Sequence, residues 1–150
     1  VDYMAVDANR RLITIQERFR EVKYCNYNDF TVRYMRPESA HANRRLSEFF
    51  KLDAKYFIYG IIDVEKYDCQ NATKFVKYAV LNLDRLKDSI DDGRIVIDGG
   101  LRSNTCERRG DTMICPIIEN RDHSSNFVPF DIVILSDVAP EVIEYQEGFF

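Results

Sequence analysis

The stretch "YFIYGIIDV", residues 56–64, lies near the middle of the chain and is almost continuously apolar. A short apolar run of this kind is typical of a strand that is buried on both faces. Residues 73–90 follow with a helical repeat of apolar positions, and "RIVID" (94–98) is a second short apolar run. The apolar positions of the repeat are Phe75, Val76, Ala79, Val80, Leu83, Leu86 and Ile90. Strand, helix and strand in this order predict a right-handed βαβ unit with parallel strands.

Upstream of this unit, the sequence predicts a helix, a strand and a second helix. Asp7 can cap a helix over residues 8–24, although the β-branched residues around Thr14 leave a strand as the alternative. The apolar stripe of that helix would contain Leu12, Ile15, Phe19 and Val22. Residues 30–34 alternate between apolar and polar and predict a strand with one exposed face. Ser39 can cap the second helix, whose inner face would hold Ala42, Leu46, Phe49 and Phe50.

Downstream, "FDIVILS" (130–136) predicts a third buried strand. Asp137 with Pro140 predicts the start of a terminal helix over 141–146. No repeat or linker divides the chain, so we expect a single domain over 1–150. The chain opens at Val1 rather than Met, which is typical of a segment processed from a longer precursor. The expected fold class is α+β, with a mixed sheet that contains one βαβ unit, packed helices and a disulfide-tied hairpin.

From Tyr56 to Gln146, the predicted order is strand, helix, strand, a disulfide-tied excursion, strand and helix start. This order is similar to the opening of a lobe in bilobed extracellular receptor domains of the periplasmic-binding type. The resemblance is one of element order, and residues 1–55 have no counterpart in it. It implies an alternative architecture for the chain, a three-layer α/β lobe.

The hairpin is predicted from the segment between Cys106 and Cys115, "CERRGDTMIC". Gly110 at the first central position of a two-residue turn is typical of a type II′ hairpin. The register then pairs Arg109 with Thr112, Arg108 with Met113, Glu107 with Ile114 and Cys106 with Cys115. The two cysteines fall at a non-hydrogen-bonded position, where Cα atoms lie about 4.5 Å apart and a disulfide can form. Cys25 and Cys69 would remain as a second pair, and buried free thiols are the alternative.

Composition favours an oxidising compartment and excludes several classes of site. The four cysteines include no CxxC pair and the chain has two histidines, His41 and His123, so zinc-type spacing is absent. Asn71 begins the sequon Asn71-Ala72-Thr73 and predicts a surface glycosylation site. Sequon and disulfides together predict an extracellular or luminal location.

No apolar run is long enough to span a membrane. A net charge of −4 gives no support for nucleic-acid binding.

Residues with catalytic potential are few. The chain has no G-x-S-x-G elbow and no phosphate-binding glycine loop, so we expect neither a catalytic triad nor a cofactor. Asp63 and Glu65 lie at the end of the first predicted strand, two residues apart and so on one face, and Asp98 ends the second strand. Carboxylates at strand ends can hold a metal ion, which makes a metal-dependent enzyme one alternative. The other is that these strands end in polar residues where they reach water.

The tip of the hairpin carries Arg109-Gly110-Asp111. It resembles the tripeptide by which adhesion proteins, disintegrins and several viral capsids bind integrins. The resemblance implies that Arg109 enters an acidic pocket and that Asp111 ligates a receptor metal ion, although the turn alone also explains Gly110. Because no catalytic constellation emerges, we expect a non-catalytic, secreted or cell-surface module that recognises a protein. Integrin adhesion and metal-dependent catalysis are the alternatives.

Overall fold

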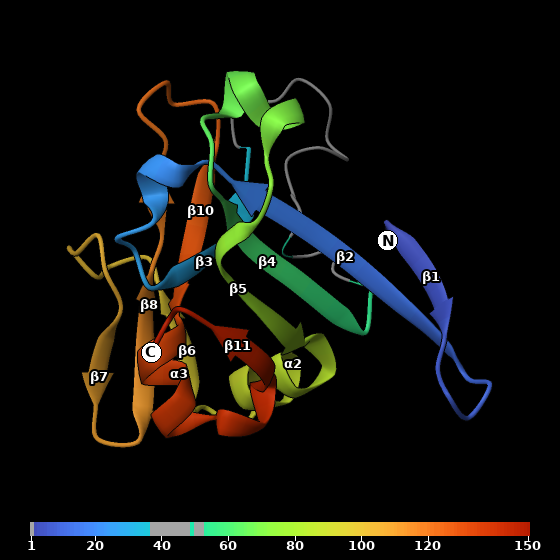
Figure 1. The fold of residues 1–150 in the computed structure, drawn as a ribbon. Helices are drawn as coiled ribbons and strands as arrows, with labels where there is room; N and C mark the ends of the chain where they lie inside the picture. The colour runs from blue at the N-terminus through green and yellow to red at the C-terminus, as the bar shows by residue number, and fades with distance from the viewer. Residues whose placement is uncertain (1, 37–48, 50–52) are drawn as a thin grey trace.

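The computed structural model describes residues 2–36, 49 and 53–150, and the strands of this part of the chain form three sheets (Figure 1). The five-stranded sheet has the order β1-β2-β4-β5-β11, and the three-stranded sheets have the orders β3-β10-β9 and β6-β8-β7. The strands of the first sheet are β1 (Tyr3–Val6), β2 (Leu12–Arg20), β4 (Tyr56–Ile62), β5 (Phe75–Asn82) and β11 (Ile143–Glu147). The strands of the others are β3 (Asp29–Met35), β10 (Asn126–Asp131), β9 (Ile118–Glu119), β6 (Ile95–Asp98), β8 (Thr112–Pro116) and β7 (Glu107–Arg109). The described helices are α2 (Leu83–Asp91), α3 (Ile132–Val138) and the 3-10 helices η1 (Val22–Tyr24), η3 (Lys66–Asn71) and η4 (Pro140–Val142).

The domain is therefore sheet-rich and broadly α+β, as expected. Pairing is mixed, because β2 is parallel to β4 and β6 is parallel to β8 while the other pairs are antiparallel. The large sheet has three antiparallel interfaces. A three-layer lobe with helices between parallel strands is thus not formed by the described residues. None of the described helices combines the length and the apolar character needed to cross a bilayer.

The helix predicted over 8–24 is wrong and its alternative, a strand, is confirmed: these residues form the turn after β1, strand β2 and the 3-10 helix η1. Asp7 Oδ1 accepts hydrogen bonds from the backbone N–H groups of Asn9 and Arg11, both at 2.8 Å. A helix cap makes similar bonds, but here they close a turn in which Arg10 has a φ of 61°. The β-branched run 13–15 favours an extended chain, and β2 finds a parallel partner in β4.

The predicted βαβ unit is also wrong. The strand predicted over 56–64 is confirmed as β4, but the residues of β5 pair with it antiparallel instead of forming a helix. Helix α2 begins only at Leu83, where Asn82 Oδ1 accepts a hydrogen bond from the Arg85 backbone N–H at 3.1 Å. The predicted strand over 94–98 is confirmed as β6, but it belongs to a different sheet, in which β8 is its parallel neighbour.

The C-terminal prediction merges two elements. The segment "FDIVILS" begins in β10, but Asp131 Oδ1 accepts a hydrogen bond from the Ile134 backbone N–H at 2.9 Å and caps α3. The predicted terminal helix is instead η4 followed by β11, which pairs with β5. The strand over 30–34 is confirmed as β3, but its residues are buried or half-buried, and neither face is exposed as predicted. The helix predicted from Ser39 lies outside the described residues.

The hydrophobic core lies where the three sheets and two helices meet. Its buried cluster includes Phe57, Tyr59, Ala79 and Leu81 from the large sheet, Phe30, Val32, Val128 and Phe130 from the second sheet, Ile95, Met113 and Cys115 from the third, and Leu83, Leu86, Ile132 and Leu135 from the helices. Phe30 joins two sheets, because its ring stacks on Phe130 at 5.0 Å between centroids and lies 6.0 Å from Phe57. The core thus buries one face of β4 and β5, whereas Met4, Val6 and Leu12 at the far end of the same sheet are exposed.

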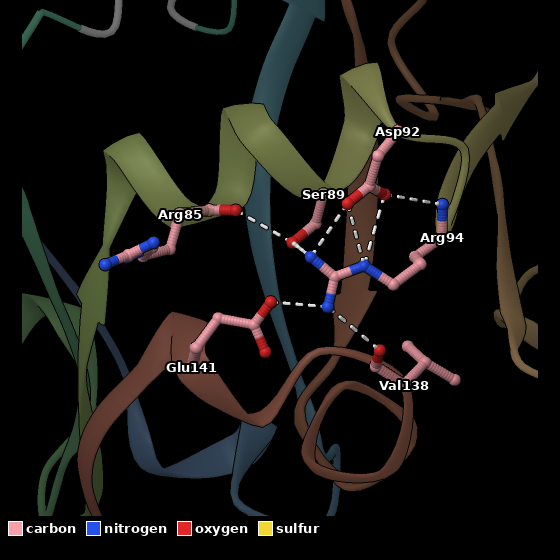
Figure 2. Close-up of polar contacts among 6 residues, drawn as sticks. All are labelled: Arg85, Ser89, Asp92, Arg94, Val138 and Glu141. Atoms are coloured by element: carbon pink, nitrogen blue, oxygen red, sulfur yellow. Dashed lines mark hydrogen bonds and ion pairs between the residues drawn. The ribbon is translucent and has the colours of Figure 1, made fainter.

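One arginine ties α2, β6 and η4 together. Arg94 Nε donates to Asp92 Oδ2 at 2.9 Å and Arg94 Nη2 donates to Ser89 Oγ at 3.1 Å (Figure 2). Arg94 Nη1 pairs with Glu141 and donates to the Val138 carbonyl at 3.4 Å. The hydrogen bond from Arg94 lowers the pKa of Asp92, and a backbone N–H together with Arg94 lowers the pKa of Glu141.

We predict that Arg94→Gln lowers the free energy of unfolding at neutral pH and that the loss shrinks in acid. The folded pKa values of both carboxyl groups lie below their unfolded values, so their stabilisation is present above about pH 5 and is lost as the pH falls. Urea unfolding of both proteins across this range measures the difference. Arg85→Gln, on the exposed side of α2, is the control and should behave as wild type. A difference that does not change with pH would contradict this account.

Candidate functional site

The large sheet has a second face that does not point to the core, which we call the outer face. By strand register, its positions are Tyr3 and Ala5 on β1, Ile13, Ile15, Glu17 and Phe19 on β2, Tyr56, Ile58, Gly60 and Ile62 on β4, Phe75, Tyr78, Val80 and Asn82 on β5, and Tyr145 and Glu147 on β11. Most of these residues are apolar or aromatic. Inner-face residues such as Phe57, Tyr59 and Leu81 are fully buried, but Tyr3, Phe19, Phe75 and Tyr145 on the outer face are exposed. The outer face is thus apolar and accessible.

Four rings form a continuous row across the outer face, which we call the aromatic row. Phe19 lies 5.1 Å from Phe75 between centroids, Phe75 lies 5.5 Å from Tyr78, and Tyr78 stacks on Tyr145 at 5.5 Å. The exposed fractions of Phe19, Phe75 and Tyr145 are 43%, 40% and 52%. Gly60 makes room for the row, because a Cβ there would lie 2.8 Å from the Phe75 ring.

The charged side chains of the outer face are acidic. Glu17 and Glu147 are its charged positions, and none of its positions is Lys or Arg. Each carboxylate accepts a hydrogen bond from a tyrosine hydroxyl of the same face, Glu17 from Tyr3 and Glu147 from Tyr145. The bond to Glu17 raises the pKa of Tyr3. These bonds orient both carboxylates beside aromatic rings.

A cavity of about 760 Å³ opens at one end of the aromatic row, where the ends of β2, β4 and β5 meet η3. Its lining is Phe19, Arg20, Glu21, Tyr24, Ile62, Lys66, Cys69, Ala72, Thr73, Lys74 and Phe75. Its size lies within the range of small-molecule sites. Two members of the aromatic row, Phe19 and Phe75, are therefore shared between the outer face and the cavity.

The predicted hairpin register is confirmed over Glu107–Ile114, Arg108–Met113 and Arg109–Thr112. Gly110 has a φ of 62° while Asp111 is not among the residues with positive φ, as a type II′ turn requires. Cys106 Sγ lies 3.6 Å from Cys115 Sγ, and both are thiols in this structure. The contact with Cys106, together with burial, raises the pKa of Cys115. The predicted bridge thus has its two sulfurs in contact but unbonded.

The other predicted cysteine pair is not in contact. Cys25 Sγ donates to Asn26 Oδ1 at 3.8 Å, and Cys69 is an exposed thiol at the edge of the cavity. Asn71 is exposed at the end of η3, where its Nδ2 donates to Asp68 Oδ1. The sequon therefore lies at the surface, and glycosylation of Asn71 stays a prediction.

The Arg-Gly-Asp sequence lies at the exposed hairpin tip. Arg109 forms an ion pair with Glu107 at 2.9 Å, and its neighbour Arg108 pairs with Asp137 at 2.6 Å. Gly110 is explained by the turn. Integrin binding through Arg109 and Asp111 stays a prediction, and cell attachment by an Asp111→Glu variant would test it.

The predicted strand-end carboxylates do not come together. Asp63 Oδ1 accepts a hydrogen bond from the Thr73 backbone N–H at 3.0 Å, and Asp98 Oδ1, in another sheet, accepts one from the Gly100 N–H at 2.8 Å. Glu65 instead lies beside Glu21, which raises the pKa of Glu65. No group of three His, Cys, Asp or Glu side chains in the described part of the chain is placed to hold a metal ion. His123 pairs with Glu119 at 2.9 Å, and His41 lies outside the described residues.

The sequence does not reveal the aromatic row, because the segments of all three of its strands, β2, β5 and β11, are predicted as helices. Phe19 falls in the predicted helix over 8–24, Phe75 in the one over 73–90 and Tyr145 in the terminal one over 141–146. The signal that could have found it is the alternation within β5, where Lys77, Ala79 and Leu81 point inward and Tyr78 points outward.

Comparison of the chain with protein-family models, with curated proteins and with solved structures found no match.

Proposed function

We propose that this protein is a secreted or cell-surface recognition module that binds a partner protein through the outer face of its five-stranded sheet. The observation that carries this proposal is the exposed aromatic row. Aromatic residues are enriched at the centres of protein interfaces, where they supply most of the binding energy. Contiguous exposed apolar surface is uncommon on proteins that act alone, and it marks interaction sites.

The charge of the outer face points to the kind of partner. Glu17 and Glu147 lie beside the row, and no basic position of the same face offsets them. In a symmetric interface between two copies, both faces would be acidic and neither would offer a basic position to these carboxylates, which is unfavourable. A different protein, with an apolar centre and a basic rim, fits better than a second copy of this chain.

Comparative capture tests the proposal. Wild type, the Tyr78→Ser/Tyr145→Ser variant and the Arg85→Gln control are immobilised and exposed to the same extract of secreted and surface proteins. We expect a partner that wild type and control retain equally and that the double variant retains at least about tenfold less. Equal retention by the double variant, with its fold intact by circular dichroism, would exclude the outer face as the binding surface.

Light scattering tests the choice of partner. We expect a monomer for the protein alone, because the acidic outer faces of two copies repel one another. A stable dimer that the Tyr78→Ser/Tyr145→Ser variant abolishes would show instead that the face binds a second copy.

We further propose that the module works in an oxidising compartment, with a disulfide between Cys106 and Cys115. The contact of 3.6 Å between the two sulfurs supports this pairing. With oxidised glutathione as the oxidant, the two thiols lose two electrons and two protons to it, the protein disulfide forms, and two molecules of reduced glutathione leave. The proposal includes a glycan on Asn71.

The predicted bridge should appear in mass spectrometry after treatment with oxidised glutathione. We expect a linked peptide pair that contains Cys106 and Cys115, and a free energy of unfolding about 2–3 kcal/mol higher than that of the reduced protein. Cys106→Ser is the control and should gain nothing from the oxidant. Protein recovered from a secreting eukaryotic host should also lose mass on glycosidase treatment, unlike Asn71→Gln. Four free thiols and no glycan would contradict the proposed compartment.

A further inference from the structure

We propose that the cavity at the end of the aromatic row is a binding site for a small aromatic anion, with Arg20 as the group that pairs with its carboxylate or sulfonate. This inference goes beyond the proposed protein-binding function: the cavity shares Phe19 and Phe75 with the outer face, but Arg20, which would pair with the anion, does not belong to that face.

The walls of the cavity suit a flat apolar ligand. Phe19 and Phe75 form one side, and both rings are exposed by about two fifths, 43% and 40%. The ring of Tyr24 and the side chain of Ile62 add further apolar surface. Aromatic rings of a ligand gain from edge and face contacts with rings in such an arrangement. The cavity therefore offers stacking surface that the fold itself leaves uncovered.

Arg20 is held in place but is not neutralised. Its guanidinium carbon lies 3.6 Å from the centre of the Tyr24 ring, and Nη1 donates a long hydrogen bond of 3.4 Å to Tyr59 Oη. Within the described chain, no carboxylate forms an ion pair with Arg20. Asp29 is close enough for Arg20 to affect its pKa, but burial dominates and raises the pKa of Asp29. Arg20 is thus a partly buried, oriented cation with donors to spare, as a bidentate anion requires.

The charge around the cavity is positive. Arg20, Lys66 and Lys74 line it, and Glu21 is the acidic side chain among the lining residues. Glu21 is already engaged, because Lys23 Nζ pairs with its carboxylate at 2.7 Å and the Lys66 backbone N–H donates to it at 2.9 Å. These contacts, with the hydrogen bond from the Lys23 side chain as the largest contribution, lower the pKa of Glu21 to about 2. An anion entering the cavity therefore meets more free positive than free negative charge.

Two dyes with the same ring system test this inference. Anilinonaphthalene sulfonate carries a negative charge, whereas N-phenylnaphthylamine has nearly the same apolar body without it. We expect wild type to bind the sulfonate more tightly than the neutral dye. Arg20→Gln should bind the sulfonate at least about tenfold more weakly than wild type does, whereas its affinity for the neutral dye should change less than about twofold. Arg85→Gln removes the same charge from α2 and should bind both dyes as wild type does.

A second measurement needs no variant. Naphthalene carboxylate should displace the sulfonate from wild type at lower concentration than naphthalene methanol does. Added salt should weaken binding of the sulfonate but not binding of the neutral dye. Equal affinity of wild type and Arg20→Gln for the sulfonate would overturn the inference. An equal loss of affinity for both dyes in Arg20→Gln would overturn it as well. So would equal displacement by naphthalene carboxylate and naphthalene methanol, because either result would show an apolar surface without an anion site.

Discussion

Replacing Phe30 with Ala is expected to lower the free energy of unfolding by about 3–5 kcal/mol, the usual cost of removing a buried aromatic ring. Phe30 is fully buried, and its ring contacts Phe130 of its own sheet and Phe57 and Tyr59 of the large sheet. Its loss leaves a cavity between the two sheets that these stiff strands cannot close.

Urea unfolding measures the effect of this change. Phe150→Ala is the matched control, since it removes the same ring from a position that is 63% exposed, and it should cost less than about 0.5 kcal/mol. Similar losses for the two variants would show that Phe30 does not join the sheets as described.

The second large effect is expected at Gly60. A Cβ at this position would lie 2.8 Å from two ring atoms of Phe75 and 3.4 Å from a ring atom of Phe19. The distance to Phe75 is much shorter than a normal contact between carbon atoms. Gly60→Val should therefore push the Phe75 ring off β4, at a cost of about 1–3 kcal/mol in unfolding free energy. Because the aromatic row is then broken, retention of the partner protein should also fall by at least about tenfold.

Gly99→Val is the control for this change. Its new Cβ would meet only the end of the Ile117 side chain at 3.3 Å, and Gly99 is not on the outer face. This variant should retain the partner as wild type does. Partner binding by Gly60→Val at wild-type strength would separate the aromatic row from recognition.

The turn of the hairpin and some of the strands can be predicted from the sequence, whereas the pairing of strands within each sheet cannot. The register around Gly110 followed from the turn residue alone, because the pairing counts outward from it. β3 and β4 were recognisable from their apolar patterns. The pairing of β2 with β4 and that of β5 with β11 join distant parts of the chain, and no local pattern identifies which strands become neighbours. Without these partners, the three- and four-residue spacing in 73–90 predicts a helix.

The candidate site shows the same division. Asp63 and Asp98 were expected together because a βαβ unit would have placed their strands side by side, but the two strands belong to different sheets. The aromatic row, in contrast, combines Phe19, Phe75, Tyr78 and Tyr145 from three strands that only the complete sheet brings together. Asp7 and Asp131 show how similar side-chain bonds serve a turn in one place and a helix start in another.

Site-specific photo-crosslinking tests the central claim, recognition through the outer face, most directly. A photoreactive phenylalanine analogue replaces Tyr145 on the outer face in one variant and Asp88 on α2 in the other, and each is irradiated with the captured partner. The account predicts that the variant at position 145 crosslinks to the partner and that the variant at position 88 does not. Equal crosslinking from both positions, or crosslinking from position 88 alone, would contradict it.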